Sequence, residues 1–273
     1  MENRLFVVNK PVFFSSNGYL NKIKRKYKTK KAGFSGTLDP FACGCLIVAF
    51  GQYSKLFRFL KKTPKSYRAT IWLGAQSDSL DIENITSIQP HKPLQEQEIV
   101  STLDSLIGSL SYLPPKYSAK KIAGQRAYNL ARSGQELDLK YITSQVYDVK
   151  FLNYCHPFIT FEITVSEGSY IRSMAQIVLE KLQSTGTLSY LERLHEGEFS
   201  FDGEKPLNPL KYLDLPTNTY TGSKDWFDMG KPLDIQYFQT KDDGEYLIVF
   251  DSFFSVIQIK DQKPSYILNK VLL

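Results

Sequence analysis

The chain has 273 residues, of which 42% are hydrophobic and 23% charged, a balance typical of globular proteins rather than disordered ones. This length suits one large domain with a small appendage, or two modest domains. The formal net charge of +6 favours an anionic partner, most commonly nucleic acid, but does not by itself identify one.

Several classes of protein are excluded by what the sequence lacks. No apolar run approaches the roughly 18 residues of a membrane span, and the N-terminus has no signal-peptide pattern. The three cysteines cannot form a complete disulfide framework, and the three histidines show no zinc spacing with them. No phosphate-binding glycine loop or dinucleotide fingerprint is present. We therefore expect a cytoplasmic protein with no membrane contact, no metal and no cofactor.

The first predicted elements are a strand and a basic helix. Leu5 to Val8 is an apolar strand candidate, and Ser15 or Ser16 can cap the helix that follows. Residues 22–31, KIKRKYKTKK, predict a helix with one thin apolar edge. Such a run is often only a solvated face, but cations beside a reactive site would attract a phosphate backbone. The candidate residues for binding a nucleic-acid backbone here are Lys24, Arg25, Lys28, Lys30 and Lys31.

Directly after this basic run comes a glycine-punctuated turn that holds a single carboxylate, Asp39. Pro40 biases Asp39 away from the helical region, and Gly36 and Gly44 permit turns or close approach by another group. The apolar run Cys45–Phe50 follows, as in a fully buried strand or the start of a helix. An acid on a rigid turn can be a reactive group, but most Asp-Pro pairs only close a turn. The pattern alone therefore makes Asp39 a candidate.

Hydrophobic spacing predicts further elements in the next part of the chain. Two acids in the polar loop of residues 74–84, Asp78 and Asp81, have no further ligands nearby, so a structural loop is a better interpretation than a metal site. Three prolines over residues 206–218 indicate a boundary, with short strands at 246–250 and 254–259 beyond it. Before that boundary the pattern predicts helices over 53–60, 95–107 and 171–182, and strands over 67–73, 146–152 and 158–165.

The turn around Asp39 resembles the active-site motif of the TruB family of pseudouridine synthases. The residues that match are Gly36-Thr37-Leu38-Asp39-Pro40, then Ala42, Gly44 and Leu46. In that family the aspartate is the essential catalytic residue, so the resemblance implies this role for Asp39. It extends over most of residues 5–205 and includes four separate motifs in the expected order.

Two of these motifs supply expected neighbours of Asp39. Ser166 to Arg172 resembles the family's S-x-G-T-Y-I-R signature, in which Arg172 is the expected ion-pair partner of the catalytic acid and Tyr170 lies near the base. We expect Arg172 to lower the pKa of Asp39 and fix its orientation. Tyr67 resembles the active-site tyrosine that packs against the flipped base, although a strand tyrosine is more often a packing residue.

Two weaker matches add residues beside the site. Lys10 belongs to a segment that resembles the opening K-P-x-G-x-S-S motif, which packs beside the catalytic loop. Leu194 matches the closing segment, where with Leu191 it would form an apolar wall of the base pocket; core packing is the alternative.

The chain departs from the family at two aromatic positions. Phe13 or Phe14 replaces the glycine of the opening motif, so we expect that loop to bend differently. Phe34 stands where relatives usually carry a histidine associated with contacting the RNA. A phenyl ring cannot donate a hydrogen bond or titrate, but it can stack on a base.

Residues 112–145 are predicted to form an RNA-contacting insertion. The pattern PP-x-YSA-x-K…G-x-x-AY-x-x-AR-x-G resembles the stand-alone bacterial branch of the family rather than the guide-RNA-dependent one. Basic residues interleaved with tyrosines suit contact with a folded RNA loop, and a solvated amphipathic helix is the alternative. The basic residues are Lys120, Lys121, Arg126 and Arg132.

The resemblance implies an α+β protein with the pseudouridine synthase fold. We expect a catalytic domain over residues 1–205, built on a mixed, mainly antiparallel central sheet with flanking helices. Residues 206–273 resemble a small β-rich PUA-like RNA-binding appendage. The implied partner is the T stem-loop of tRNA, bound by a monomer without guide RNA or cofactor.

The implied reaction is the isomerisation of uridine to pseudouridine at position 55 of the T loop. The base is flipped out, cleaved from C1′, rotated and rejoined through C5. Two alternatives remain open: a tRNA-binding or tRNA-folding protein whose catalysis is weak or dispensable, and a synthase that acts on another RNA uridine.

Overall fold

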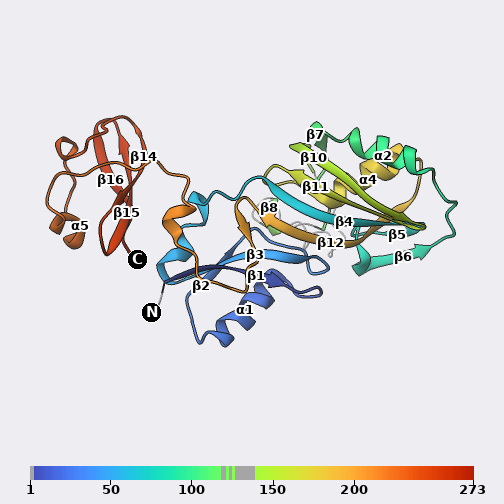
Figure 1. The fold of residues 1–273 in the computed structure, drawn as a ribbon, viewed down its shortest axis with the longest axis horizontal. Helices are drawn as coiled ribbons and strands as arrows, with labels where there is room; N and C mark the ends of the chain where they lie inside the picture. The colour runs from blue at the N-terminus through green and yellow to red at the C-terminus, as the bar shows by residue number, and fades with distance from the viewer. Residues whose placement is uncertain (1–2, 118–120, 123–124, 127–138) are drawn as a thin grey trace.

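The computed structural model describes residues 3–117, 121–122, 125–126 and 139–273. Within these residues, nine strands form a central sheet (Figure 1). The strands are β1 (Arg4–Lys10), β2 (Ala32–Ser35), β3 (Cys43–Phe50), β4 (Lys65–Leu73), β7 (Gly108–Tyr112), β10 (Ile142–Cys155), β11 (Phe158–Val165), β12 (Gly186–Glu196) and β13 (Phe199–Ser200).

The central sheet is mixed but mainly antiparallel, as predicted. Its order is β1–β3–β12–β4–β11–β10–β7, with β2 beside β3 and β13 beside β12. Only β3 and β12 run parallel among these described pairs, through Glu192 opposite Cys43 and Arg193 opposite Gly44. This contact places the segment that follows Asp39 beside β12, in the middle of the sheet.

Strand β3 carries the unbroken apolar run because both of its faces are covered. Leu46 and Val48 pack against helix α1 (Ser16–Lys26). Ile47 lies on the opposite face, in a cluster that also contains Phe254 of the C-terminal region. The second large core lies under helices α2 (Glu96–Asp104) and α4 (Ile171–Lys181), which pack with β4, β10, β11 and β12.

Two of the predicted helices are wrong in extent or type. The basic helix α1 spans Ser16–Lys26 and does not continue to residue 31, whereas its predicted cap is confirmed: Ser15 accepts from the backbone N–H of Gly18. The chain leaves the helix at Tyr27, and Lys28 takes a φ of 50°. The segment predicted as a helix over 53–60 instead forms two short 3₁₀ turns, η1 (Gly51–Lys55) and η2 (Phe57–Phe59).

The C-terminal region forms a separate antiparallel sheet at one end of the molecule (Figure 1). Its strands are β14 (Gly244–Val249), β15 (Phe253–Lys260) and β16 (Lys263–Leu272), of which only the first two were predicted. One side of this sheet shares a core with β1 and β3, and the other packs against helix α5 (Asp225–Met229).

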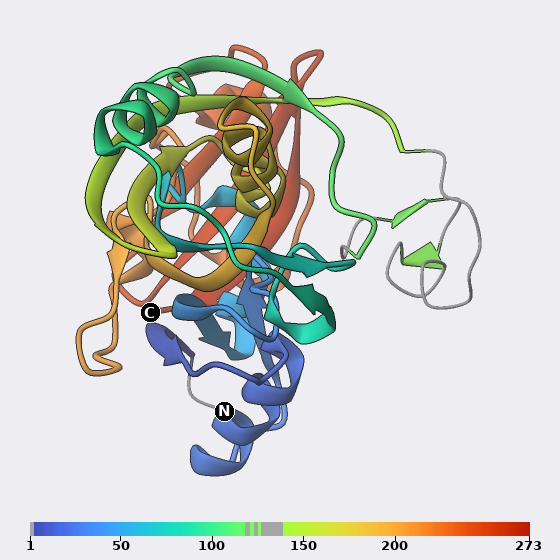
Figure 2. The ribbon, with the colours of Figure 1, turned by 90° about the vertical axis from the view of Figure 1, so that its right-hand side faces the viewer.

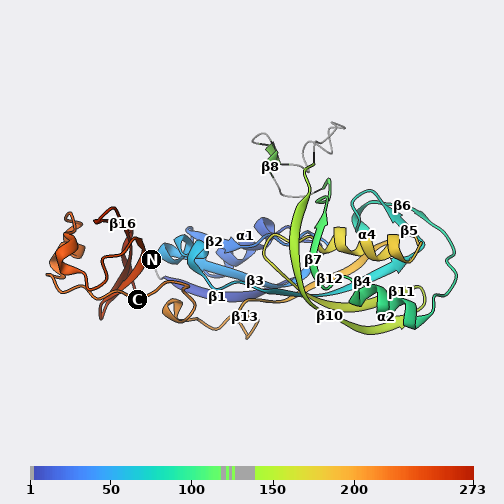
Figure 3. The same ribbon diagram turned by 90° about the horizontal axis from the view of Figure 1, so that it is seen from above.

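The remaining elements are short. A hairpin of β8 (Lys121–Ile122) and β9 (Gln125–Arg126) stands away from the sheet, beyond the ends of β7 and β10 (Figures 2 and 3). No helix in the described ranges is long and apolar enough to cross a membrane. The other short elements are β5 (Ala75–Ser77), β6 (Ile85–Ile88) and the 3₁₀ turns η3 (Ile82–Asn84), η4 (Pro209–Lys211) and η5 (Ile235–Tyr237).

Candidate active site

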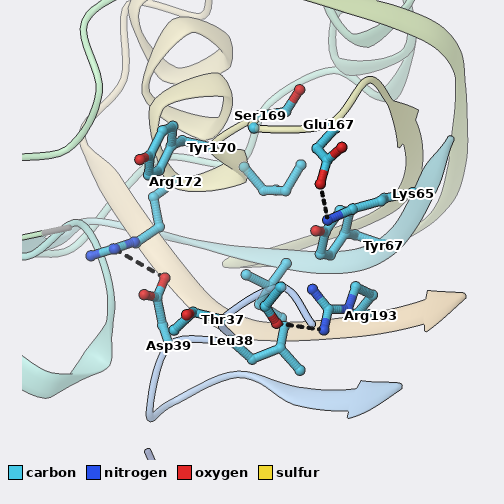
Figure 4. A pocket seen from close by; sticks show the side chains of 14 residues that line it. Thr37, Leu38, Asp39, Lys65, Tyr67, Glu167, Ser169, Tyr170, Arg172 and Arg193 are labelled. Carbon is cyan, nitrogen blue, oxygen red and sulfur yellow. Dashed lines mark hydrogen bonds and ion pairs between the residues drawn. The ribbon is translucent and has the colours of Figure 1, made fainter. Parts of the chain in front are cut away.

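A pocket of about 330 Å³ opens at the middle of the central sheet (Figure 4). Four segments line it: the turn at residues 36–39, the start of β4, residues 167–172 at the start of α4, and β12. Asp39, Tyr67, Tyr170 and Arg172, which the sequence predicted as site residues, all line this pocket.

Two other predicted residues lie elsewhere. Leu194 does not line the pocket, whereas Leu191 does. Leu191 and Arg193 line the pocket from β12, and Leu194 follows them at the register shift of this strand between Arg193 and His195. Lys10 is fully buried behind the turn rather than in the pocket, as expected for a residue that packs beside the catalytic loop.

Asp39 is held by Arg172. Its Oδ2 lies 2.9 Å from Nη2 of Arg172, and its side chain is 33% exposed while that of Arg172 is 4% exposed. The guanidinium is anchored independently of Asp39, because it also donates to the backbone oxygens of Ser79 (2.8 Å) and Tyr117 (2.7 Å). These bonds fix the position of Arg172, which in turn orients the more accessible carboxylate of Asp39.

Asp81 is a site residue that the sequence analysis assigned only to a structural loop. It is buried, and its Oδ2 lies 3.1 Å from Nη1 of Arg172. Its Oδ1 accepts from the hydroxyl of Ser79 (2.6 Å) and the backbone N–H of Glu83 (3.0 Å). Arg172 therefore bridges two carboxylates, and Asp81 orients it from the side away from the pocket.

The pKa of Asp39 is shifted in the direction opposite to the one we expected. Burial raises the pKa above its ordinary value of 3.8, and Asp81 adds to this rise. Arg172 and Lys10 lower the pKa, as their positive charges require, but they do not outweigh burial. Arg172 orients the carboxylate and only partly offsets the cost of ionising it.

Lys10 links the loop of residues 11–14 to the turn that carries Asp39. Nζ of Lys10 donates to the backbone oxygens of Phe14 (2.7 Å), Pro11 (2.9 Å) and Pro40 (3.4 Å). Burial lowers the pKa of Lys10 to about 8, although Cys43 and Asp39 oppose the shift. The buried ammonium ties three carbonyls of two segments together.

The same loop carries the aromatic substitution. We expected a phenylalanine in place of glycine to change the bend; instead Phe13 itself takes a φ of 62°, the left-handed conformation that glycine favours. Its backbone N–H donates to the oxygen of Pro40 (2.6 Å).

A second charged cluster, which the sequence did not predict, lies under the other side of the turn. Arg193 donates through Nη2 to the oxygen of Gly36 (2.9 Å) and through Nε to the oxygen of Cys45 (2.8 Å). Glu196 lies 3.3 Å from Arg193 Nη2 and 2.9 Å from Nζ of Lys65. All three charged side chains of this Arg193–Glu196–Lys65 cluster are buried.

Gly36 fits this cluster only because it has no side chain. It has a φ of 64°, and a Cβ there would lie 2.9 Å from Oε1 of Glu196. Gly44 is equally constrained, with a φ of 103° and a Cβ position 2.3 Å from the backbone oxygen of Arg193. Both glycines permit the close approach that the sequence indicated.

None of the predicted RNA-binding residues whose side chains are described lines the pocket. Phe34 is half-buried on β2 against the α1 core, and Lys24 is half-buried on α1. Lys120 and Arg132 lie outside the described residues, and for Lys121 and Arg126 only the backbone pairing of β8 with β9 is described. The remaining four are exposed: Arg25, Lys28, Lys30 and Lys31.

The pocket combines a carboxylate with walls suited to a planar base. Tyr67, Leu191 and Ile171 contribute aromatic and aliphatic surface, and Asp39 stands at one side. Within the described residues no three His, Cys, Asp or Glu side chains are grouped as metal ligands.

Comparison with known proteins identifies the family. Residues 24–171 match the model of the TruB family pseudouridylate synthase N-terminal domain. The protein called tRNA pseudouridine synthase B from a Sulfurovum species is 55% identical over 98% of this chain and 97% of its own length. Its namesake from Campylobacter concisus is 54% identical over 98% of both chains.

Solved structures agree on the fold. The crystal structure of a Cbf5-Nop10-Gar1 complex contains a chain that superimposes with a TM-score of 0.66, at 18% identity, over 99% of this chain and 84% of that one. An archaeal box H/ACA Nop10-Cbf5 complex gives a TM-score of 0.65 at 17% identity, with 99% and 85% covered. With its domain match, its near full-length relatives and this fold, the chain belongs to the TruB family of pseudouridylate synthases.

Proposed function

We propose that this protein isomerises uridine to pseudouridine at position 55 of the T loop of tRNA, with Asp39 as the essential carboxylate. The observation that carries the proposal is the Asp39–Arg172 pair at the wall of a pocket lined by Tyr67 and Tyr170. The name shared by relatives up to 55% identical supports tRNA as the substrate.

The chemistry follows from the pocket. A uridine removed from its stack enters the pocket, with its base against Tyr67 and its ribose toward Asp39. The C1′–N1 bond breaks and a C1′–C5 bond forms, while C5 loses its hydrogen and N1 gains one. Because substrate and product have the same composition, the step needs no oxidant or reductant.

Each side chain has a part in this reaction. Asp39 provides the group that both a nucleophilic attack and proton abstraction at the ribose require. Arg172 keeps that group aimed, and Tyr67 and Leu191 hold the detached base and exclude water. Lys10 acts through the loop it clamps rather than on the substrate.

Residues outside the pocket bind the RNA in this proposal. The exposed cations Arg25, Lys28, Lys30 and Lys31 and the Lys120–Arg132 segment contact the T stem-loop, with Phe34 and Lys24 beside them. Residues 1–205 form the catalytic domain, and residues 206–273 an RNA-binding appendage. The protein works as a cytoplasmic monomer without guide RNA.

The test is to incubate the purified protein with an unmodified tRNA transcript and no other RNA or cofactor. Carbodiimide-based primer extension maps every pseudouridine formed. Wild type and Asp78→Asn, in which an exposed acid of a neighbouring loop is neutralised, should convert position 55, and Asp39→Asn should not. Sedimentation of the active sample should give a monomer.

Other results would replace the proposal. Tight tRNA binding without conversion by wild type would favour a tRNA-binding or tRNA-folding protein. Conversion only at another uridine would overturn the assigned position, and equal conversion by Asp39→Asn would overturn the assigned carboxylate.

A further inference from the structure

Phe13 is an exposed aromatic ring on a strained backbone. Its side chain is 68% exposed, and its φ of 62° is unfavourable for a bulky residue. An exposed phenyl ring gains little from burial, so packing does not offset this strain. Strained residues of this kind cluster at functional sites.

The backbone that carries this ring is nevertheless held in place by hydrogen bonds. The backbone N–H of Phe13 donates to the oxygen of Pro40, the residue that follows Asp39. On either side, the oxygens of Pro11 and Phe14 accept from the buried Lys10. The Phe13 backbone is therefore fixed relative to the proposed catalytic carboxylate.

The next residue, Phe14, differs from Phe13 in the contacts of its ring. The ring of Phe14 is half-buried, with Nζ of Lys22 3.8 Å from its centre and the ring of Tyr19 6.3 Å away. Phe13 has no such ring or cation contact among the described residues, and 68% of its surface faces solvent. The ring of Phe14 therefore has partners within the protein, whereas most of the surface of Phe13 is exposed to solvent.

We infer that Phe13 stacks on a nucleobase of the RNA next to the flipped uridine. The inference rests on the proposed function and adds a positioning residue to it. Flipping a nucleotide leaves a neighbouring base with an uncovered face, and an aromatic side chain covers such a face whatever the base. Phe13 is hydrogen-bonded to the residue after Asp39 and precedes helix α1 by three residues in the chain, and the cations of that helix suit the phosphate backbone of the same strand.

The test compares three substitutions at this position. Phe13→Gly removes the ring and also the backbone strain, Phe13→Leu keeps an apolar side chain without a flat face, and Phe13→Trp keeps the face. Phe13→Gly should raise KM for the tRNA transcript by about 5- to 150-fold, the range for loss of one base–aromatic stack. Its kcat should stay within about twofold, and Phe13→Trp should restore KM while Phe13→Leu should not.

A fluorescence measurement reads the stack directly. T stem-loops that carry 2-aminopurine beside the target uridine are titrated with Asp39→Asn protein, which holds the RNA without turnover. Adding Phe13→Gly to that protein should reduce the quenching on binding, and Phe13→Trp should preserve it. Because this readout needs no catalysis, it separates failure of the stack from failure of the proposed reaction.

A matched glycine substitution controls for backbone effects. Gln183 is exposed and has a φ of 49° in the turn after α4, and Gln183→Gly should leave KM and quenching unchanged. Equal KM and equal quenching for wild type and Phe13→Gly would overturn the inference. So would full rescue by Phe13→Leu, since that would assign the effect to apolar bulk.

Discussion

Nη1 of Arg172 lies 3.1 Å from Oδ2 of Asp81, and both side chains are almost completely buried. Without Asp81, this buried guanidinium would keep only the partly exposed Asp39 as a carboxylate partner among the described residues, and Nη1 would lose one of its two acceptors. Asp81 therefore supports the arginine that in turn orients Asp39.

We predict that Asp81→Asn lowers kcat on a tRNA transcript by roughly 100-fold, because the Arg172–Asp39 geometry loosens. KM should change little, since Asp81 does not line the pocket. Single-turnover kinetics with wild type, Asp81→Asn and the exposed control Asp78→Asn measure the effect. An Asp81→Asn enzyme with wild-type kcat would show that Arg172 is held well enough by Ser79 and Tyr117 alone.

The second prediction concerns the stability of Asp39→Asn. The folded pKa of Asp39 is raised, so folding favours its protonated form, and the ionised carboxylate costs stability at neutral pH. Asp39→Asn removes the proposed catalytic carboxylate and should abolish activity. Because it also removes a buried charge, Tm at pH 7 should be equal to or above that of wild type. As pH falls through the folded pKa of Asp39, wild type becomes protonated and the difference should shrink.

Thermal unfolding of wild type and Asp39→Asn from pH 7 down to pH 4 checks this trend. A Tm for Asp39→Asn well below wild type at pH 7 would mean that the ion pair with Arg172 outweighs burial. The pKa of Asp39 would then lie below 3.8 in the folded protein.

The third prediction concerns Lys10 at alkaline pH. Its pKa of about 8 implies that the ammonium, and with it the clamp on Pro40, is lost above that pH. We expect kcat/KM to fall as pH rises through about 8. The free energy of unfolding should instead rise with pH. The folded pKa of Lys10 lies below its unfolded value of 10.5, so between pH 8 and 10.5 the folded protein loses a buried charge that destabilises it.

Activity and urea unfolding measured together over pH 7–10 test this opposition. Lys10→Arg keeps its charge throughout and should not show the alkaline decline, whereas Lys10→Met should be roughly 10- to 100-fold less active at every pH. A wild-type profile that is flat to pH 10 would show that the clamp does not depend on the Lys10 charge.

The sequence predicted the sheet and the pocket residues that belong to local motifs. Alternating apolar runs located β1, β4, β10 and β11, because period-two burial is a local property, whereas the continuous run of β3 left a buried strand and the start of a helix both open. Asp39, Tyr67, Tyr170 and Arg172 came from motifs whose members the fold then brings to one pocket.

What the sequence missed depends on contacts between distant segments. Asp81 acquires its partner Arg172 from the start of α4, and Glu196 lies opposite Lys65 only where β12 pairs antiparallel with β4. No local pattern indicates either contact. Leu194 does not line the pocket, whereas Leu191 does; Leu194 lies at the register shift of β12 against β4, and that shift depends on the pairing of two distant strands. The end of α1 was missed because lysines favour a helix, yet the chain turns left-handed at Lys28.

The last prediction uses two glycines with the same backbone conformation. Gly36 and Gly203 have φ values of 64° and 63°, but a Cβ at Gly36 would meet Glu196, Arg193 and Lys65, whereas a Cβ at Gly203 would meet nothing within 4 Å. Both alanine substitutions cost the same left-handed strain, about 1–2 kcal/mol. Only Gly36→Ala also pushes the turn that carries Asp39 away from the buried cluster, so its kcat should fall by roughly 100-fold while Gly203→Ala keeps wild-type kcat. Kinetics and Tm for both variants separate the effect of backbone strain from the effect of the contact with the charged cluster. An equal loss of kcat in both variants would show that left-handed strain, and not the charged cluster beneath the turn, accounts for the loss.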